Sequence, residues 1–269
     1  MNNKALRKIA DEIRKQIITM AYIAKSAHSG GSLSCADLLA VLYFSILKID
    51  PKKPKDKKRD RFIFSKAHDS KALYAALAER GFFKKDVLLK YEKDNGLPGH
   101  PTIDVLPGVE VTAGSLGHGL SIGAGMAYVA KTDKLNYRVF VMLSDGECDE
   151  GSVWEAALFA GHHKLSNLIA IVDYNKIQSY GRTDEILSLE PFGKKWESFD
   201  WEVKEVDGHN ISEIEKSLRK IPFFGNKPSV LIAHTIKGYK GVPRHVDKVS
   251  SHYKPPTKEE YKEVMKRLS

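Results

Sequence analysis

The stretch from residue 139 to residue 180 constrains the fold more than any other part of the chain. It holds two apolar runs, one leading into Asp145 and the other into Asn175, with a helix-like segment between them. These two residues are 175 − 145 = 30 positions apart, which suits one strand–helix–strand unit. In such a unit both side chains lie at the carboxyl end of a parallel sheet, where ligands bind.

The residue types at this predicted edge favour a divalent cation held against a diphosphate. Asp145 offers a carboxylate, Asn175 an amide oxygen and Ile177 a backbone carbonyl. Mg²⁺ takes few ligands from protein and leaves the rest to phosphates and water. Gly146 allows close approach of the backbone to a ligand, and a helix starting near Gly151 would favour a phosphate. An Asp-Gly turn with a capping asparagine would give the same pattern, so these residues alone also fit a structural role.

The composition of the chain limits the classes of protein to which it can belong. The 269 residues suffice for one large α/β domain or two small ones, and the 42% hydrophobic fraction supports a buried core. No run of eighteen apolar residues occurs, so we expect no membrane span. The charged first segment lacks the apolar core of a signal peptide, so we expect a cytoplasmic protein.

The net charge of 43 − 34 = +9 is spread over the chain, with its densest basic run at residues 52–61. This run has no interleaved aromatic residues, so a solvated loop is favoured over a nucleic-acid surface, and we expect no nucleic-acid partner. Cys35 and Cys148 lack the spacing of a disulfide framework or a zinc site.

Apolar periodicity predicts alternating helices and strands in one α/β domain spanning residues 1–269. The predicted strands consist of apolar residues that do not alternate cleanly with polar ones, as is typical of a sheet buried on both faces. We therefore predict a doubly wound, mostly parallel sheet with helices on both faces, and a C-terminal loop and helix at about 238–269. The predicted strands are 61–65, 137–143, 168–173 and 229–234, and the predicted helices are 4–25, 35–48, 69–80, 119–131, 151–164, 211–220 and 257–268.

Four histidines lie in loops rich in glycine, serine or proline: His28, His68, His100 and His252. Each alone would be a weak signal, because lone histidines are usually structural or merely exposed. Beside a metal–diphosphate motif they predict a polar pocket for a polyhydroxylated substrate. Neutral imidazoles can donate and accept hydrogen bonds to sugar hydroxyls and can move protons near pH 7.

These motifs together resemble the transketolase family. The segment SDGECDEGSVWEAALFAGHHKLSNLIAIVDYN resembles the thiamine diphosphate motif, with Ser144 in place of its usual first glycine. The loops SAHSGG, SKAH, LPGHP and TAGSLGHGLSIGAGMA follow the family in the same order, from about residue 5 to the C-terminus. The resemblance implies a thiamine-diphosphate-binding fold, specifically the domain that holds the diphosphate.

Carried over residue by residue, the resemblance implies three sets of functional residues. Asp145, Asn175 and Ile177 would bind Mg²⁺, or Ca²⁺ or Mn²⁺ in its place. His28, His100 and His252 would face the sugar and act in catalysis. The residues implied in cofactor binding are Lys66, His68, Gly114, Ser115, Leu116, Gly146, Glu147, Glu150, Glu155, Asn175 and Lys237.

Glu150 and Glu155 match acidic residues that link cofactor sites across a subunit interface. A structural role would explain both residues nearly as well, because the helix dipole favours negative charges at the start of a helix.

The implied activity is transfer of a two-carbon ketol unit from a ketose to an aldose. A complete transketolase is more than twice this length and carries a pyrimidine-binding domain with the glutamate that activates the cofactor. The resemblance therefore implies the N-terminal subunit of a split transketolase, inactive alone. Its partner would be a C-terminal subunit with that domain, and the two chains would form an α2β2 heterotetramer. The substrates would be sugars, phosphorylated as is usual in the family.

Departures from the family pattern leave the substrate open. Tyr91, Glu92 and Lys93 occupy the region where transketolases often carry a phosphate-binding arginine, and Tyr253 replaces the glycine after the last histidine. A pentose-phosphate role and a specialised sugar-modifying role both fit. Among thiamine enzymes the alternatives are a deoxyxylulose-phosphate synthase and a 2-oxo-acid dehydrogenase component. Outside enzymes, the alternatives are a non-catalytic transketolase-like regulator and a basic nucleic-acid-binding domain.

Overall fold

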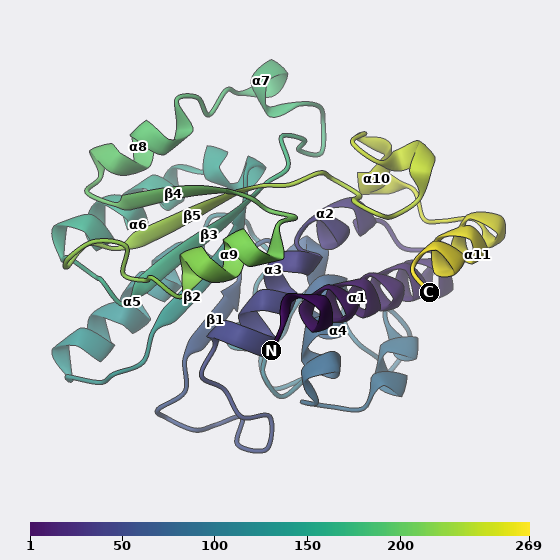
Figure 1. The fold of residues 1–269 in the computed structure, drawn as a ribbon, viewed down its shortest axis with the longest axis horizontal. Helices are drawn as coiled ribbons and strands as arrows, with labels where there is room; N and C mark the ends of the chain where they lie inside the picture. The colour runs from purple at the N-terminus through teal and green to yellow at the C-terminus, as the bar shows by residue number, and fades with distance from the viewer.

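The computed structural model describes residues 1–269 and centres on one sheet of five parallel strands (Figure 1). Their order is β1-β2-β3-β5-β4, and every pairing is parallel. The strands are β1 (Arg61–Phe64), β2 (Val139–Ser144), β3 (Leu168–Tyr174), β4 (Glu202–Asp207) and β5 (Ser229–His234). The predicted parallel α/β architecture is confirmed.

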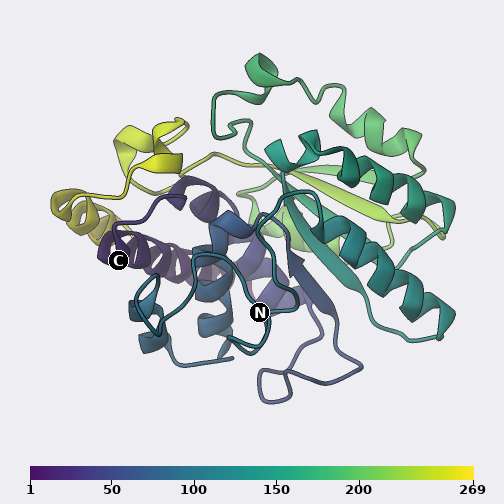
Figure 2. The ribbon, with the colours of Figure 1, turned by 180° about the vertical axis from the view of Figure 1, so that it is seen from behind.

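Helices cover both faces of the sheet, because alternate strand residues point to opposite sides. On β2, Phe140 and Met142 join one apolar core while Val139, Val141 and Leu143 join the other. Figure 1 shows helices of the first core in front of the sheet, and Figure 2 shows α5 and α6 on the opposite side. The first core is covered by α1 (Asn3–Ala24), α3 (Ala36–Val41), α4 (Ser70–Arg80), α9 (Ile211–Leu218) and α11 (Lys258–Arg267), and the second by α5 (Gly119–Thr132), α6 (Gly151–His162) and α8 (Phe192–Ser198).

Most of the predicted elements are present, and the differences have local causes. The predicted helix over 35–48 is α3 followed by a π-helical turn at Leu42–Ile46. Strand β4 was not predicted, because it is an edge strand in which only Val206 is buried and its charged sequence lacks a strand pattern. Short elements were also missed: α2 (Ser29–Ser34), α7 (Thr183–Ile186), α8, α10 (Ser250–Tyr253) and 3₁₀ turns at Ala67–Asp69, Lys85–Lys90, Gly146–Asp149 and Pro243–His245.

The first and last helices of the chain, α1 and α11, pack against each other beside the sheet. Thr257 caps α11 with a reciprocal capping box, and Tyr261 of this helix stacks on Tyr22 of α1 at 4.6 Å between ring centroids. Just before it, α10 packs on α2, so the C-terminal segment closes over the loop that carries His28 (Figure 1). No helix has both the length and the apolar character needed to span a membrane.

Candidate active site

The carboxyl ends of β2, β3 and β5 converge on one cavity of about 170 Å³. Asp145 follows β2, Asn175 follows β3, and Lys237 lies in the loop after β5, so the predicted 30-residue spacing does bring the two polar residues to the same sheet edge. The lining residues are Gly31, His68, Asp69, Leu116, Ser144, Asp145, Gly146, Asn175, Ile177, Gln178, Ser179, Lys237 and His252.

The predicted metal ligands are held by backbone hydrogen bonds. Asp145 is 1% exposed, and its carboxylate accepts from the backbone N–H groups of Gly146 at 2.8 Å and Lys176 at 2.5 Å. The Asn175 side-chain oxygen accepts from the N–H of Ile177 at 3.1 Å, which fixes the turn. Burial raises the pKa of Asp145 to about 6, so this carboxylate is poorly compensated and would gain from a cation.

The donor set fits a hard cation that shares its ligands with a diphosphate. No group of three or more histidine, cysteine, aspartate or glutamate side chains is placed to hold a metal by itself. One carboxylate, one amide oxygen and one carbonyl leave the remaining positions of an octahedral ion to phosphate and water, as Mg²⁺ prefers. The ammonium of Lys237, 2.5 Å from the carbonyl oxygen of Ile177, already places a positive charge there.

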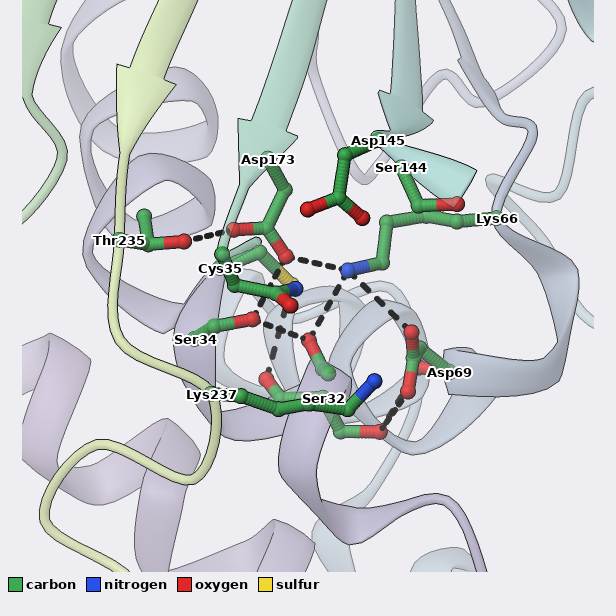
Figure 3. A network of polar contacts seen from close by, with 12 residues as sticks. Ser32, Ser34, Cys35, Lys66, Asp69, Ser144, Asp145, Asp173, Thr235 and Lys237 are labelled. Carbon is green, nitrogen blue, oxygen red and sulfur yellow. Dashed lines mark hydrogen bonds and ion pairs between the residues drawn. The ribbon is translucent and has the colours of Figure 1, made fainter. Parts of the chain in front are cut away.

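Lys66 lies beneath this cavity and not in its wall (Figure 3). Its ammonium is ion-paired with Asp173 and with Asp69 at 3.2 Å, and it donates to the Gly31 carbonyl at 3.0 Å. Burial disfavours the charged form, but these carboxylates outweigh it and hold the pKa of Lys66 well above its ordinary value. Lys66 thus supports two residues that line the cavity, Gly31 and Asp69, while its direct contact with the cofactor stays a prediction.

Three of the four predicted histidines form one cluster. The ring centroids are 4.5 Å apart for His28 and His252, 5.4 Å for His28 and His68, and 5.7 Å for His68 and His252. Burial lowers the pKa of His68 to about 4 and that of His252 to about 3, and it also lowers the pKa of His28. The cluster is therefore neutral near pH 7 and suited to hydroxyl groups.

His100 lies on the exposed loop beyond α4, near enough to His28 for its charge to add to the effect of burial in lowering the pKa of His28. A Cβ built on Gly114 would lie 3.9 Å from the His100 ring, so the two predicted residues adjoin each other. Leu116 of the same glycine-rich segment lines the cavity, whereas Gly114 and Ser115 lie outside its wall.

Three predicted glutamates lie outside the cavity wall. Glu147 is fully buried, and it accepts from the N–H of Gly117 at 2.9 Å and from the hydroxyl of Ser65. It therefore holds the segment that carries Leu116 and does not face the cavity. Glu150 and Glu155 are exposed at the start of α6.

Sequence reasoning missed five residues of the cavity wall, among them Ser144, which was noted only as the residue in place of the motif's first glycine. Gly31 and Asp69 belong to the loops SAHSGG and SKAHDS that the histidines singled out, so their position in those loops was an available signal. Gly31 leaves no room for a side chain, since a Cβ there would collide with the carboxylate of Asp69. Gln178 and Ser179 carried no signal beyond following Ile177.

Comparison with known proteins agrees with this geometry. Residues 5–269 match the family described as transketolase, thiamine diphosphate binding domain. The chain is 43% identical to a protein of Phocaeicola vulgatus named as one subunit of apulose-4-phosphate transketolase, covering 100% of this chain and 95% of that protein. It is 42% identical to 6-deoxy-6-sulfo-D-fructose transketolase subunit SqwG of a Clostridium species, covering 96% of this chain and 94% of that protein.

Full-length transketolases extend well beyond the matched region. The human enzyme is 36% identical over 98% of this chain, which corresponds to 42% of its own length. The transketolase structure from Campylobacter jejuni superposes with a TM-score of 0.92 at 31% identity, over 100% of this chain and 43% of that one. The chain therefore belongs to the thiamine diphosphate binding domain family of transketolases.

Proposed function

We propose that this chain is the diphosphate-binding subunit of a two-chain transketolase, which transfers a two-carbon ketol unit from a ketose to an aldose. The observation that carries the proposal is the joining, at one sheet edge, of a cation–diphosphate cavity and a cluster of neutral histidines. The near-complete coverage of two relatives named as transketolase subunits supports the two-chain form.

The residues of the cavity have different proposed roles, in binding the metal ion, the diphosphate and the aminopyrimidine. Asp145, Asn175 and the Ile177 carbonyl would hold Mg²⁺, with Ca²⁺ or Mn²⁺ as substitutes. Bound thiamine diphosphate would supply the carbon nucleophile for the ketose carbonyl and the electron sink that C–C cleavage requires. Lys237 and His68 would bind the diphosphate oxygens with the backbone at Gly146, and Gly114, Ser115 and Leu116 would line the aminopyrimidine side.

The histidines would serve the sugar. His28, His252 and His100 would hydrogen-bond its hydroxyls, and the ring nitrogens of His28 and His252 would accept or return protons. Their lowered pKa values keep the acceptor nitrogens free at neutral pH.

The partner would be a C-terminal subunit with the pyrimidine-binding domain, in an α2β2 assembly. The exposed positions of Glu150 and Glu155 at the start of α6 fit a contact between subunits. We take residues 1–269 as one diphosphate-binding domain, because elements from α1 to α11 build the two cores on a single sheet. Because the charged helix α1 is part of that core, we also keep the prediction of a cytoplasmic enzyme.

The substrates we propose are sugars, phosphorylated in at least one reactant. Two relatives are named for apulose-4-phosphate and for 6-deoxy-6-sulfo-D-fructose, so we include specialised sugars beside ordinary pentose phosphates among the candidate substrates. A deoxyxylulose-phosphate synthase or 2-oxo-acid dehydrogenase role is not favoured, because the matching subunits are transketolases.

The test is reconstitution. The chain is purified alone and with the product of a neighbouring reading frame that encodes a pyrimidine-binding domain. Ketol transfer is then assayed with phosphorylated, free and nucleotide-linked sugars. We expect Mg²⁺-dependent cofactor binding and transfer only with both chains present. Appreciable transfer by this chain alone would refute the two-chain proposal.

A further inference from the structure

The backbone at His28 adopts a left-handed conformation, with φ 61° and ψ 34°. A non-glycine residue pays a conformational cost there and keeps the conformation only when its surroundings enforce it. Three hydrogen bonds do so. The N–H of His28 donates to the His252 carbonyl at 2.6 Å, the His28 carbonyl accepts from the Ser32 hydroxyl at 2.8 Å, and the preceding carbonyl of Ala27 accepts from the Lys71 ammonium at 2.7 Å.

Lys71 is the unusual member of this set. It lies on α4 and is 1% exposed, yet both of its hydrogen-bond partners are uncharged: the Ala27 carbonyl and the Tyr91 hydroxyl at 3.4 Å. Its ammonium also lies 4.7 Å from the centroid of the Tyr91 ring. Burial lowers the pKa of Lys71 to about 8, although Glu92 and Asp69 act to raise it. Burial therefore destabilises the charged ammonium at this position.

The same part of α4 also holds the loop that leads to His100. The Ser70 hydroxyl lies 3.0 Å from the Tyr91 hydroxyl and donates to the Gly99 carbonyl at 2.6 Å. One turn later, the Tyr74 hydroxyl lies 3.0 Å from the carbonyl of His100. Helix α4 therefore binds the backbone of both sugar-facing loops, and Lys71 with Tyr91 forms the bridge between them.

We propose that Lys71 is a positioning residue that fixes His28 relative to His100 and so sets the geometry of the sugar-hydroxyl site. The inference rests on the proposed function, because it assumes that both histidines contact the sugar. Hydrogen bonding to a hydroxyl tolerates little displacement, and a shift of about 1 Å in a positioned group can cost about 100-fold in rate. A methionine in place of Lys71 would fill the space but release the Ala27 carbonyl and leave His28 free to relax.

The test uses the reconstituted two-chain enzyme with Lys71→Met, Lys71→Arg and the matched control Lys84→Met, at an exposed lysine shortly after α4. We expect Lys71→Met to lower kcat/KM for the ketose about 10- to 100-fold. The Kd for thiamine diphosphate should stay within about threefold, since Lys71 does not line the cavity. Lys71→Arg keeps a donor and should recover much of the loss, and Lys84→Met should match the parent enzyme.

A double variant separates this inference from the proposed function. If Lys71 acts through His28, adding Lys71→Met to His28→Ala should cause no further loss. Full additivity, or normal turnover of Lys71→Met when His28→Ala is slow, would overturn the inference. Normal turnover of His28→Ala would instead remove the proposed sugar role of His28. If Lys71→Met does not fold, Tyr91→Phe tests the same bridge. A smaller loss of kcat/KM in the same direction is expected, and an unchanged kcat/KM would count against the inference.

Discussion

The ammonium of Lys237 lies 2.5 Å from the carbonyl oxygen of Ile177, the oxygen predicted as a metal ligand. Burial lowers the pKa of Lys237, while the Asp145 carboxylate opposes that shift, so the cavity carries its own poorly solvated cation. A divalent ion at Asp145 would compete with this ammonium for the same oxygen, and the arriving diphosphate could then accept the ammonium.

Lys237→Met should therefore change two affinities in opposite directions. Mg²⁺ alone should bind more tightly, because the Ile177 carbonyl is freed and a like charge is removed. Thiamine diphosphate at saturating Mg²⁺ should bind about 10-fold more weakly, because one charged hydrogen bond is lost. Calorimetric titrations with and without cofactor measure both, and parallel changes would show that the ammonium does not exchange partners.

Asp145→Asn keeps the size of the side chain and removes its charge. We expect thiamine diphosphate binding in the presence of Mg²⁺ to weaken by at least about 100-fold, since a hard cation depends on its anionic ligand. The control is Asp184→Asn, whose side chain is 73% exposed on the surface. Retained Mg²⁺-dependent binding by Asp145→Asn would exclude Asp145 as the metal ligand.

His100→Ala should slow ketose turnover while leaving cofactor affinity nearly unchanged. The side chain lies outside the cavity wall, so cofactor binding should be spared. Loss of the proposed sugar contact should cost about 1–3 kcal/mol, or roughly 10- to 100-fold in kcat/KM. His234→Ala, at a surface histidine paired with Glu205, serves as the control. A weakened cofactor Kd in His100→Ala would mean that His100 is not a substrate residue.

Lys66→Met should destabilise the protein by about 3–5 kcal/mol, because it leaves Asp173 and Asp69 as buried charges without their cation. Urea unfolding in the absence of cofactor measures this directly. A nearly unchanged midpoint together with lost cofactor binding would instead support the implied direct contact with the diphosphate.

Acid should destabilise the fold through the histidine cluster. Because burial lowers the pKa of His68 from 6.5 to about 4, the unfolded chain binds a proton that the folded protein refuses. Stability is thus complete above about pH 6.5 and falls as the pH decreases toward 4, by about 1 kcal/mol per pH unit. His68→Gln should flatten this dependence in urea unfolding at pH 7, 6 and 5, and an unchanged slope would assign the acid sensitivity to other groups.

The fold was largely readable from the sequence because its central signals are local. The apolar runs of β2, β3 and β5 and the position of Asp145 and Asn175 at strand ends follow from short-range patterns. Strand β4 was missed because its pairing with β5, and not its own sequence, makes it a strand.

Side-chain direction in the site was harder to predict. Motif position placed Lys66 near the cofactor site, but whether its ammonium faces the cavity depends on Asp173, 107 residues away. Likewise, Glu147 turns inward because Ser65 and Gly117, both distant in sequence, supply its hydrogen bonds. Lys71 carried no motif at all, since its role depends on the backbone conformation of another loop.

The hydrogen bond between the backbones of His28 and His252 joins positions 252 − 28 = 224 residues apart. Contacts so distant in sequence form slowly, because a long loop must close before they contribute. On the ribosome, the segment that carries His28 must wait until residue 252 has been made before its partner exists. The loops that carry these two histidines therefore reach their final arrangement only after a segment made much later has folded onto them.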